Sequence, residues 1–185
     1  MANITNVKHI KMGSVETPIG NIIVAYSGLG LCFSEFENPG PRLAEFRKIN
    51  SYATIDQPAL LDTPYPQAFR KYFSGDFSAF DGLKQDIHGS EFQKRVWRKM
   101  QVIPPGETLT YGEIARAIGH IGAARAVGHA SKLNPLGLVV PCHRVLGSGD
   151  RLVGYGGYQQ GLERKQWLLD HEGYCQQTKL KGRVL

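Results

Sequence analysis

The sequence predicts a mixed α/β (α+β) fold in two domains, a small domain with a β-sheet over residues 1–88 and a mostly helical domain over residues 89–185. Two observations predict this division. In the first part, apolar runs rich in β-branched residues alternate with turn signals, which is typical of strands. The second part begins with a helix-capping pattern and then repeats apolar residues at helical spacing. A chain of 185 residues can form one large domain or two small ones, and it is long enough to bury a core.

The first domain is expected to contain a pair of strands. A turn signal at residues 17–20 precedes a β-branched run at 21–26, and Gly28 and Gly30 separate that run from a partly alternating one at 31–36. After these strands we expect a helix at 41–50, an irregular stretch at 51–66 that contains three prolines, and a short helix at 67–73 that Gly75 ends.

The second domain is expected to begin near Gly89 with an amphipathic helix. Residues 90–93, Ser-Glu-Phe-Gln, match a capping box, whose side chains bind free N–H groups of the first turn. Apolar residues then recur at helical spacing and would share one buried face, while basic residues occupy much of the rest. The apolar set is Phe92, Val96, Trp97 and Met100, and the basic set is Lys94, Arg95, Arg98 and Lys99.

Two short helices around a glycine-containing turn are expected next. A second capping box at residues 110–113, Thr-Tyr-Gly-Glu, opens a helix over 114–118 that Gly119 ends. The second helix is expected at 123–132, before the Asn-Pro pair at 134–135. This layout is typical of a helix-turn-helix, although many helical hairpins that share it bind nothing.

The second of these helices has a smooth surface. Ala124, Ala126 and Gly128 are small, and few long side chains are present that could read bases in the major groove. Small residues permit a close approach to DNA without sequence readout, which suits docking in the minor groove. The alternative is that the alanines pack against the protein's own core.

The net charge of +6 is unevenly distributed. Residues 1–90 carry 8 Lys and Arg against 9 Asp and Glu, whereas residues 91–185 carry 14 against 7. A basic excess in one half indicates a surface that faces a polyanion, and a solvated basic face without a partner is the alternative.

The N-terminus and the cysteines indicate an intracellular protein. The first residues lack a secretion signal, and no apolar run approaches the roughly 20 residues needed to span a bilayer. Cys32, Cys142 and Cys175 lie far apart and are odd in number, which disfavours a disulfide framework. We therefore expect a cytoplasmic protein, or a nuclear one in a eukaryote, that has no membrane partner.

The chemistry is expected at Cys142. An apolar run at 136–140 predicts a buried strand that ends just before this residue, and His143 and Arg144 would favour its reactive thiolate form. A single buried cysteine is usually only a small hydrophobic residue. A metal site is disfavoured because no Cys/His cluster supplies further ligands. A nucleophilic cysteine is the better interpretation of these surroundings.

A nucleophilic cysteine needs a base, and the base needs a group that orients it. His143 is the obvious base. The orienting carboxylate must come from elsewhere, and Glu172, at the end of a helix expected over 162–171, is one candidate. Spacing alone does not select it over the other nearby carboxylates, which are Asp150, Glu163 and Asp170.

A run rich in glycine and tyrosine follows at residues 152–158. It matches no phosphate-binding pattern well. The run is either a plain hairpin turn or a wall that encloses a flat ligand.

With these motifs in place, residues 90–173 resemble the O6-alkylguanine-DNA alkyltransferases, also called methylated-DNA–protein-cysteine methyltransferases. The first turn and strand resemble the first domain of that family more weakly. The matching runs, in order, are Ser-Glu-Phe-Gln at 90–93 with Val96 and Trp97, Ile-Pro-Pro-Gly at 103–106, Thr-Tyr-Gly-Glu-Ile-Ala at 110–115, Ala-Ala-Arg-Ala-Val-Gly at 123–128, Asn-Pro at 134–135, Pro-Cys-His-Arg-Val at 141–145, Gly-Tyr-Gly-Gly at 154–157, and Trp-Leu-Leu at 167–169 with Glu172.

The resemblance implies a ribonuclease-H-like N-terminal domain and a winged-helix-like C-terminal domain that carries the helix-turn-helix. It implies DNA repair by one irreversible transfer of an alkyl group, such as methyl, from O6-alkylguanine in duplex DNA to Cys142. The target base must be flipped out of the stack, which costs a few kcal/mol. No metal and no organic cofactor are expected, and the protein is expected to act as a monomer.

The resemblance also implies roles for the residues around the nucleophile. His143 would deprotonate Cys142 through a water molecule, and Glu172 would hold the imidazole. Asn134 would brace the turn that shapes the pocket. The guanine pocket would be lined by Val145, Tyr155 and Gly156.

A second set of residues would contact the duplex. Arg125 would enter the helix in place of the extruded nucleotide, and Tyr111 would rotate the neighbouring phosphate and donate a hydrogen bond to the guanine. The small residues of the second short helix that would lie against DNA are Ala124, Ala126 and Gly128.

Two departures from the family pattern carry expectations of their own. Tyr158 stands where a second glycine commonly follows, which would narrow the pocket for bulky alkyl groups. Some relatives bind zinc through N-terminal Cys and His residues, whereas the matching stretch here offers Cys32 and little else. No zinc site is therefore expected.

Three other functions compete with alkyl transfer. A protein that binds alkylated DNA without repairing it would lack the acceptor cysteine, which is present here. A Cys-His hydrolase that uses Cys142, His143 and Glu172 would turn over repeatedly instead of once. A helix-turn-helix regulator would need more base-reading side chains on residues 123–132 than this helix offers.

Overall fold

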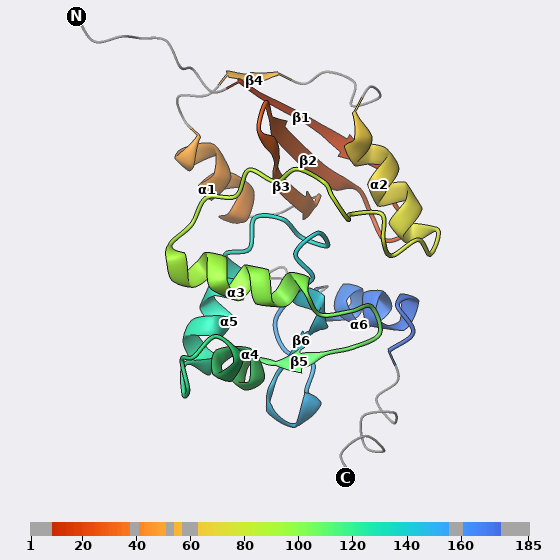
Figure 1. Cartoon of the computed structure of the whole chain (residues 1–185). Helices are drawn as coiled ribbons and strands as arrows, with labels where there is room; N and C mark the ends of the chain where they lie inside the picture. Colours follow the sequence, from red (N-terminus) through yellow and green to blue (C-terminus); the bar gives the residue numbers. More distant parts are fainter. Residues whose placement is uncertain (1–8, 38–40, 51–53, 57–62, 156–160, 175–185) are drawn as a thin grey trace, which may run out of the picture. The chain divides into compact units, whose positions relative to one another are not determined.

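The computed structural model describes residues 9–37, 41–50, 54–56, 63–155 and 161–174 (Figure 1). The chain divides into two compact units. The first comprises Met1–His88 together with Pro135–Gly137, and the second comprises Gly89–Asn134 with Leu138–Leu185. Three residues from the later sequence thus belong to the N-terminal unit.

The first unit is built on a four-stranded sheet. Its strands are β1 (His9–Val15), β2 (Ile22–Ser27), β3 (Gly30–Phe36) and β4 (Thr54–Asp56), in the order β3-β2-β1-β4. The first three are antiparallel neighbours, whereas β4 runs parallel to β1. The expected pair of strands at β2 and β3 is confirmed, but β1 was not expected. One of the two central strands therefore lay outside the predicted elements.

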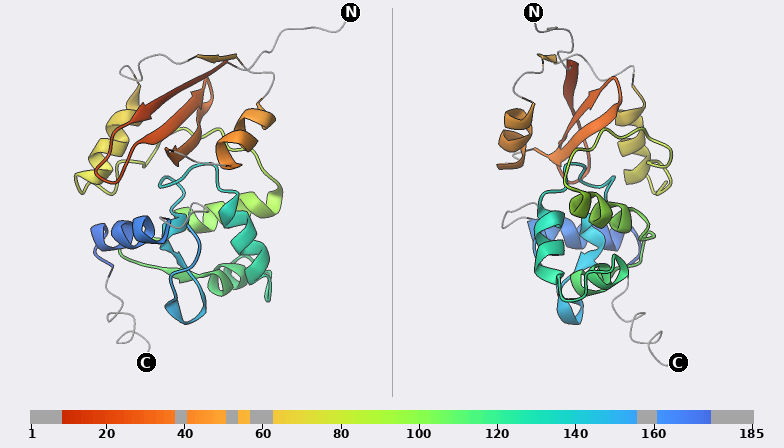
Figure 2. Two further views of the ribbon diagram at one scale, coloured as in Figure 1. Left: turned by 180° about the vertical axis from the view of Figure 1, so that it is seen from behind. Right: turned by 60° about the vertical axis from the view of Figure 1, so that its left-hand side comes forward.

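Two helices cover opposite faces of this sheet (Figures 1 and 2). On one face, Phe46 of α1 (Pro41–Ile49) packs with Met12, Ala25 and Phe33 of the strands. On the other face, the ring of Tyr65 in α2 (Pro64–Phe73) lies 5.1 Å from that of Tyr26 in β2, between centroids. This helix–sheet–helix layering buries both faces of the short sheet.

The expectation of an irregular stretch over residues 51–66 is wrong at two places. β4 lies within it, and α2 begins at Pro64, three residues earlier than expected. Prolines fit the first turn of a helix because the N–H groups there have no intrahelical partner. The prolines at 64 and 66 therefore begin the helix instead of preventing it.

In the second unit, α3 (Glu91–Gln101) begins with the expected capping box. The Ser90 hydroxyl accepts from the Gln93 N–H, and the Gln93 side chain accepts from the Ser90 N–H at 2.7 Å. On the apolar face Val96, Trp97 and Met100 are buried and Phe92 is half-buried. The Trp97 indole N–H donates to the Ala130 carbonyl at 2.9 Å. This bond joins α3 to α5 (Ala124–Lys132).

The two expected short helices are present as α4 (Tyr111–Ala117) and α5. Thr110 and Glu113 complete the second capping box, and Gly119 ends the first helix with a positive φ of 77°. The unit also contains two short strands, β5 (Leu109–Thr110) and β6 (Val145–Leu146), which pair in parallel. Its other described elements are the 3-10 helices η2 (Cys142–Arg144) and η3 (Ser148–Asp150) and the helix α6 (Gly161–His171).

The predicted strand over residues 136–140 is wrong. All five residues are buried, but Leu138 and Val139 form a turn, and Leu138 adopts a positive φ of 69°. Ser34 of β3 forms an isolated parallel bridge with Leu136. The apolar run therefore reflects burial in a turn, which sequence periodicity does not distinguish from a buried strand.

The mixed α/β class is confirmed, with a small N-terminal sheet and a helical second unit. The ribonuclease-H-like and winged-helix-like labels stay predictions. In the part of the chain that the structure describes, no helix combines the length and the apolar character needed to cross a membrane.

Candidate active site

Cys142 is the first residue of η2, directly before β6. Only 4% of the residue is exposed. Its backbone N–H donates to the Val140 carbonyl at 2.7 Å. The thiol therefore lies on a tight 3-10 turn, and the expectation that it ends a strand is wrong.

His143 is fully buried next to this cysteine. Its Nε2 lies 2.8 Å from Oε1 of Glu172, while Nδ1 has no hydrogen-bond partner among the described residues. A neutral imidazole that donates from Nε2 to a carboxylate keeps its lone pair on Nδ1. We assign this tautomer from the hydrogen-bond network. It leaves a buried, basic nitrogen that can accept a proton.

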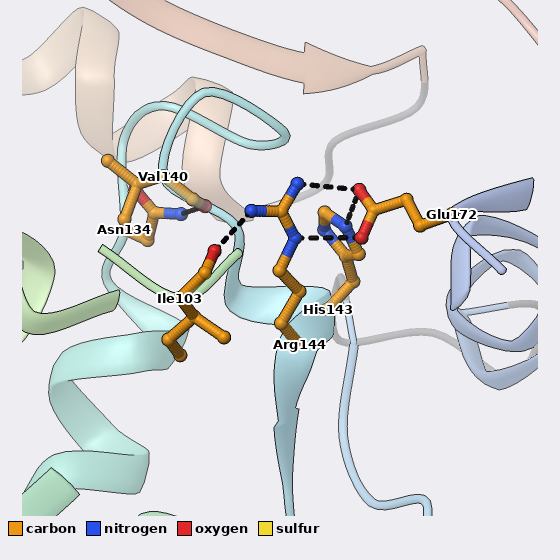
Figure 3. Close-up of polar contacts among 6 residues, drawn as sticks. All are labelled: Ile103, Asn134, Val140, His143, Arg144 and Glu172. Atoms are coloured by element: carbon orange, nitrogen blue, oxygen red, sulfur yellow. Dashed lines mark hydrogen bonds and ion pairs between the residues drawn. The ribbon is translucent and has the colours of Figure 1, made fainter. Parts of the chain in front are cut away.

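Glu172, just beyond the end of α6, is the carboxylate that the structure brings to His143. Arg144 also binds it in a bidentate manner, with Nε donating to Oε2 at 2.7 Å and Nη2 donating to Oε1 at 2.8 Å (Figure 3). Burial acts to raise the pKa of Glu172, but the charges and hydrogen bonds of His143 and Arg144 outweigh it and lower the pKa. Glu172 is therefore ionised at neutral pH.

Arg144, in η2 beside His143, binds the carboxylate that orients the histidine. Its guanidinium holds Glu172, and its Nη1 donates to the carbonyl of Ile103 (Figure 3). The expectation that Arg144 favours the thiolate of Cys142 stays a prediction. A bidentate contact fixes the plane of the carboxylate, and through it the orientation of the His143 ring.

The pKa of His143 is lowered, mainly because burial disfavours the charged imidazolium, and the nearby cations Arg144 and Lys165 add to this. The negative charge and hydrogen bond of Glu172 act in the opposite direction. The imidazole is consequently neutral at neutral pH, which is the form that can act as a base.

Lys165 of α6 is a charged residue that the sequence analysis missed. The residue is fully buried, and its Nζ donates to the carbonyls of Val153, at 2.9 Å, and Val145. Burial lowers its pKa to about 8, while the charge of Cys142 acts to raise it. A lysine three and four residues before Leu168 and Leu169, on the apolar side of a helix, was the signal that could have revealed it.

Asn134 braces the chain that leads to the nucleophile. Its side-chain amide donates to the Val140 carbonyl at 2.8 Å (Figure 3), and the residue is only 1% exposed. The same carbonyl accepts the Cys142 N–H. Asn134 and Cys142 are therefore tied to one oxygen atom.

A groove of about 720 Å³ lies on the second unit between α4, α5 and η3. Tyr111 and Arg125 line it, and Gly128 leaves room beside the Tyr111 ring. The pKa of Tyr111 is raised, mainly by burial and then by the charge of Cys142, while a hydrogen bond with Ser131 lowers it. Tyr111 therefore lines the groove with a phenol that stays protonated at neutral pH.

The small residues that were expected to contact DNA differ in their positions. Ala124 lines the groove together with Gly128, whereas Ala126 is exposed on α5 outside the groove lining. The alternative, that the alanines pack in the core, fits Ala130, which is 1% exposed. The helix therefore uses its small residues on both faces.

The residues expected to line a guanine pocket are only partly described. Val145 is fully buried in β6, and the Tyr155 ring lies edge-on to His143, with their centroids 6.4 Å apart. Gly156 and Tyr158 lie outside the described residues. Among the described residues, no group of three or more His, Cys, Asp or Glu side chains is arranged to hold a metal ion.

Comparisons with known proteins agree on one family. The family model "6-O-methylguanine DNA methyltransferase, DNA binding domain" matches residues 91–174. A methylated-DNA–protein-cysteine methyltransferase of Mycolicibacterium paratuberculosis is 43% identical over 167 residues, which cover 86% of this chain and 90% of the relative.

Solved structures from Mycobacterium tuberculosis have the same fold. Its O6-methylguanine methyltransferase matches with a TM-score of 0.74 and 36% identity, over 88% of this chain and 92% of that one. A structure of the protein named OGT from the same organism, in complex with DNA, matches with a TM-score of 0.73 and 38% identity, over 89% of this chain and 92% of that one.

Proposed function

Because this chain belongs to the methylated-DNA–protein-cysteine methyltransferase family, we propose that it repairs duplex DNA by moving an alkyl group from O6 of guanine to Sγ of Cys142. The observation that carries the proposal is the buried His143, held by Glu172 through Nε2 while Nδ1 is left without a protein partner among the described residues. A nucleophile, a base and a group that orients the base are then present in order.

In the proposed reaction, a water molecule passes the Cys142 proton to Nδ1 of His143. The thiolate attacks the alkyl carbon, the S–C bond forms as the bond from that carbon to O6 breaks, and guanine leaves with its electron pair. The proton returns to guanine, so both products are neutral. Water does not cleave the resulting thioether, and each molecule acts once.

The charges around the base support this direction of proton flow. Glu172 stabilises the imidazolium that forms when His143 takes the proton, and Arg144 keeps the carboxylate in place. The lowered pKa of His143 keeps the imidazole available as an acceptor before the reaction. Lys165 adds a positive charge whose interaction with Cys142 favours the thiolate.

The groove supports a duplex as the substrate. Arg125 is exposed at its edge, and small residues beside Tyr111 permit a backbone to approach closely. We assign Arg125 to the space left by the flipped nucleotide, and Tyr111 to the phosphate and the guanine edge. Val145, Tyr155 and Gly156 are assigned to the guanine pocket.

The test is intact-protein mass spectrometry after incubation with duplex DNA that contains O6-methylguanine. One added methyl, located on the peptide with Cys142, is expected for the wild type. Cys142→Ala should gain none and still bind the duplex, while Cys32→Ala should react like the wild type. Methyl transfer by Cys142→Ala would overturn the acceptor assignment.

The same experiment separates the competing functions. Repeated release of product without a mass change would indicate a hydrolase. Binding of the modified duplex by the wild type without any transfer would indicate a damage-binding protein. Either result would contradict the proposal.

A further inference from the structure

The segment just before the nucleophile is held by a single residue of β3. The Ser34 N–H donates to the Pro135 carbonyl at 2.9 Å, and the Ser34 carbonyl accepts from the Gly137 N–H at 2.7 Å. In addition, the Ser34 hydroxyl donates to the Gly137 carbonyl at 2.8 Å. Ser34 is fully buried, so water does not compete for these bonds.

These bonds fix both polar backbone groups of Gly137. Gly137 also approaches β3 closely, since a Cβ on it would stand 3.0 Å from the Ser34 carbonyl oxygen. The next residue, Leu138, has a positive φ of 69°. A residue with a branched side chain adopts this conformation at a cost of about 1–3 kcal/mol, and only where its surroundings hold it there. The two bonds of Ser34 to Gly137 are positioned to do so.

The chain leaves the second unit after Asn134 and returns to it at Leu138. The residues on either side of this segment are joined by the bond from the Asn134 side chain to the Val140 carbonyl. The same carbonyl accepts the Cys142 N–H. A shift of the Gly137 peptide would therefore pass through Leu138 to Val140, and from there to the first residue of η2.

We propose that Ser34 is a positioning residue for Cys142, because its hydroxyl fixes the Gly137 peptide and with it the turn that sets the place of the thiol. This inference rests on the proposed function only for its first test. It gives the N-terminal unit a part in the chemistry, although that unit contributes no reacting group.

Ser34→Ala removes one donor and leaves the Gly137 carbonyl buried without it, while the two backbone bonds can remain. We expect the rate of methyl transfer to fall about three- to tenfold, the range that follows from the loss of one buried neutral hydrogen bond. The dissociation constant for duplex DNA should stay within twofold, because Ser34 does not line the groove. Ser34→Thr, which retains the hydroxyl, should fall between Ser34→Ala and the wild type.

Ser27→Ala is the matched control. Ser27 is a buried serine of the same sheet, and its hydroxyl donates to Asp86 instead of to the segment before Cys142. Its loss should lower the free energy of unfolding by a similar amount without changing the transfer rate. If both alanine variants lose transfer rate equally, or if neither does, Ser34 has a structural role only and the inference is wrong.

A second measurement keeps the test independent of the DNA reaction. Iodoacetamide labels thiols, and peptide mass spectrometry gives the labelling rate of Cys142 against pH in each variant. We expect a changed pH profile at Cys142 in Ser34→Ala and an unchanged one in Ser27→Ala. Identical profiles in the two variants would overturn the inference, whereas a wild type that labels normally but transfers no methyl would overturn only the proposed function.

Discussion

The charge network around His143 and the groove beside Tyr111 belong to the same unit, yet they differ in their relation to water. His143 and Glu172 are buried, and each charged group is satisfied by a neighbour. The groove is lined by the exposed Arg125 and by small residues. The contribution of the buried network to stability should therefore depend on pH and on the presence of each partner. Binding in the groove should depend on the length of the ligand and on the salt concentration.

The largest effect is expected from Glu172→Ala, which leaves the guanidinium of Arg144 without its carboxylate. Breaking a buried ion pair on one side costs about 3–5 kcal/mol. Urea unfolding followed by circular dichroism should show a loss of this order. Glu163→Ala, on the exposed side of α6, is the control and should change stability by less than about 0.5 kcal/mol. Equal losses of stability in both variants would contradict the view that the buried ion pair stabilises the protein more than an exposed carboxylate does.

Lys165 makes the stability of the protein depend on pH in the alkaline range. Its pKa of about 8 in the folded protein is below that of an unfolded lysine, so the unfolded chain binds more protons between these values. The wild type should therefore gain about 2 kcal/mol of stability from this group between pH 7 and 9.5. Lys165→Met should lack this gain, and Lys132→Met, at an exposed site, should keep it. If the stability of Lys165→Met and of the wild type changed equally with pH, the gain could not be assigned to Lys165.

The groove is tested by Arg125→Ala. We expect the repair rate of duplex DNA to fall about tenfold, or about 1.4 kcal/mol, because the space of the flipped nucleotide is no longer filled. The reaction with the free modified base should be unchanged. Arg98→Ala, an exposed arginine on α3 outside the groove, is the control. Equal losses on duplex and free base would exclude the role of Arg125 in the duplex.

The smallest effect is expected from His143 at acidic pH. Its pKa is lowered in the folded protein, mainly by burial, so the unfolded chain takes up the proton first as the pH falls below about 6.5. Stability should then decrease by about 1 kcal/mol for each unit of pH, until the folded protein is protonated too. His143→Gln should flatten this part of the pH profile, whereas His129→Gln, at an exposed site, should not.

The parts of the fold that depend on local chemistry were predicted from the sequence. The capping boxes at Ser90 and Thr110 are examples, because the bonding side chains lie within four residues of each other. The burial of residues 136–140 was predicted but their turn was not, because the backbone there is bonded to Ser34, which is distant in sequence. β1 was missed because its apolar residues are few and a glycine lies among them.

In the candidate site too, contacts between residues distant in sequence were not predicted from local patterns. Cys142 and His143 could be selected from adjacent residue types, but spacing did not choose Glu172 among four carboxylates, and the resemblance to a known family was needed. The bidentate contact of Arg144 with Glu172 joins residues on different elements. Sequence patterns describe neighbours along the chain, so a contact of this kind became visible only in three dimensions.

The hydrogen bond from the Trp97 indole to α5 also makes tryptophan fluorescence a probe of the contact between α3 and α5. This tryptophan is 3% exposed and is tied to the carbonyl of Ala130. Separation of α3 from α5 would bring water to the indole and shift its fluorescence emission to the red. In a Trp167→Phe variant, which leaves Trp97 as the one tryptophan of the sequence, emission recorded during DNA binding would therefore report whether the helix that bears Arg125 moves as a rigid part of its unit or detaches from α3.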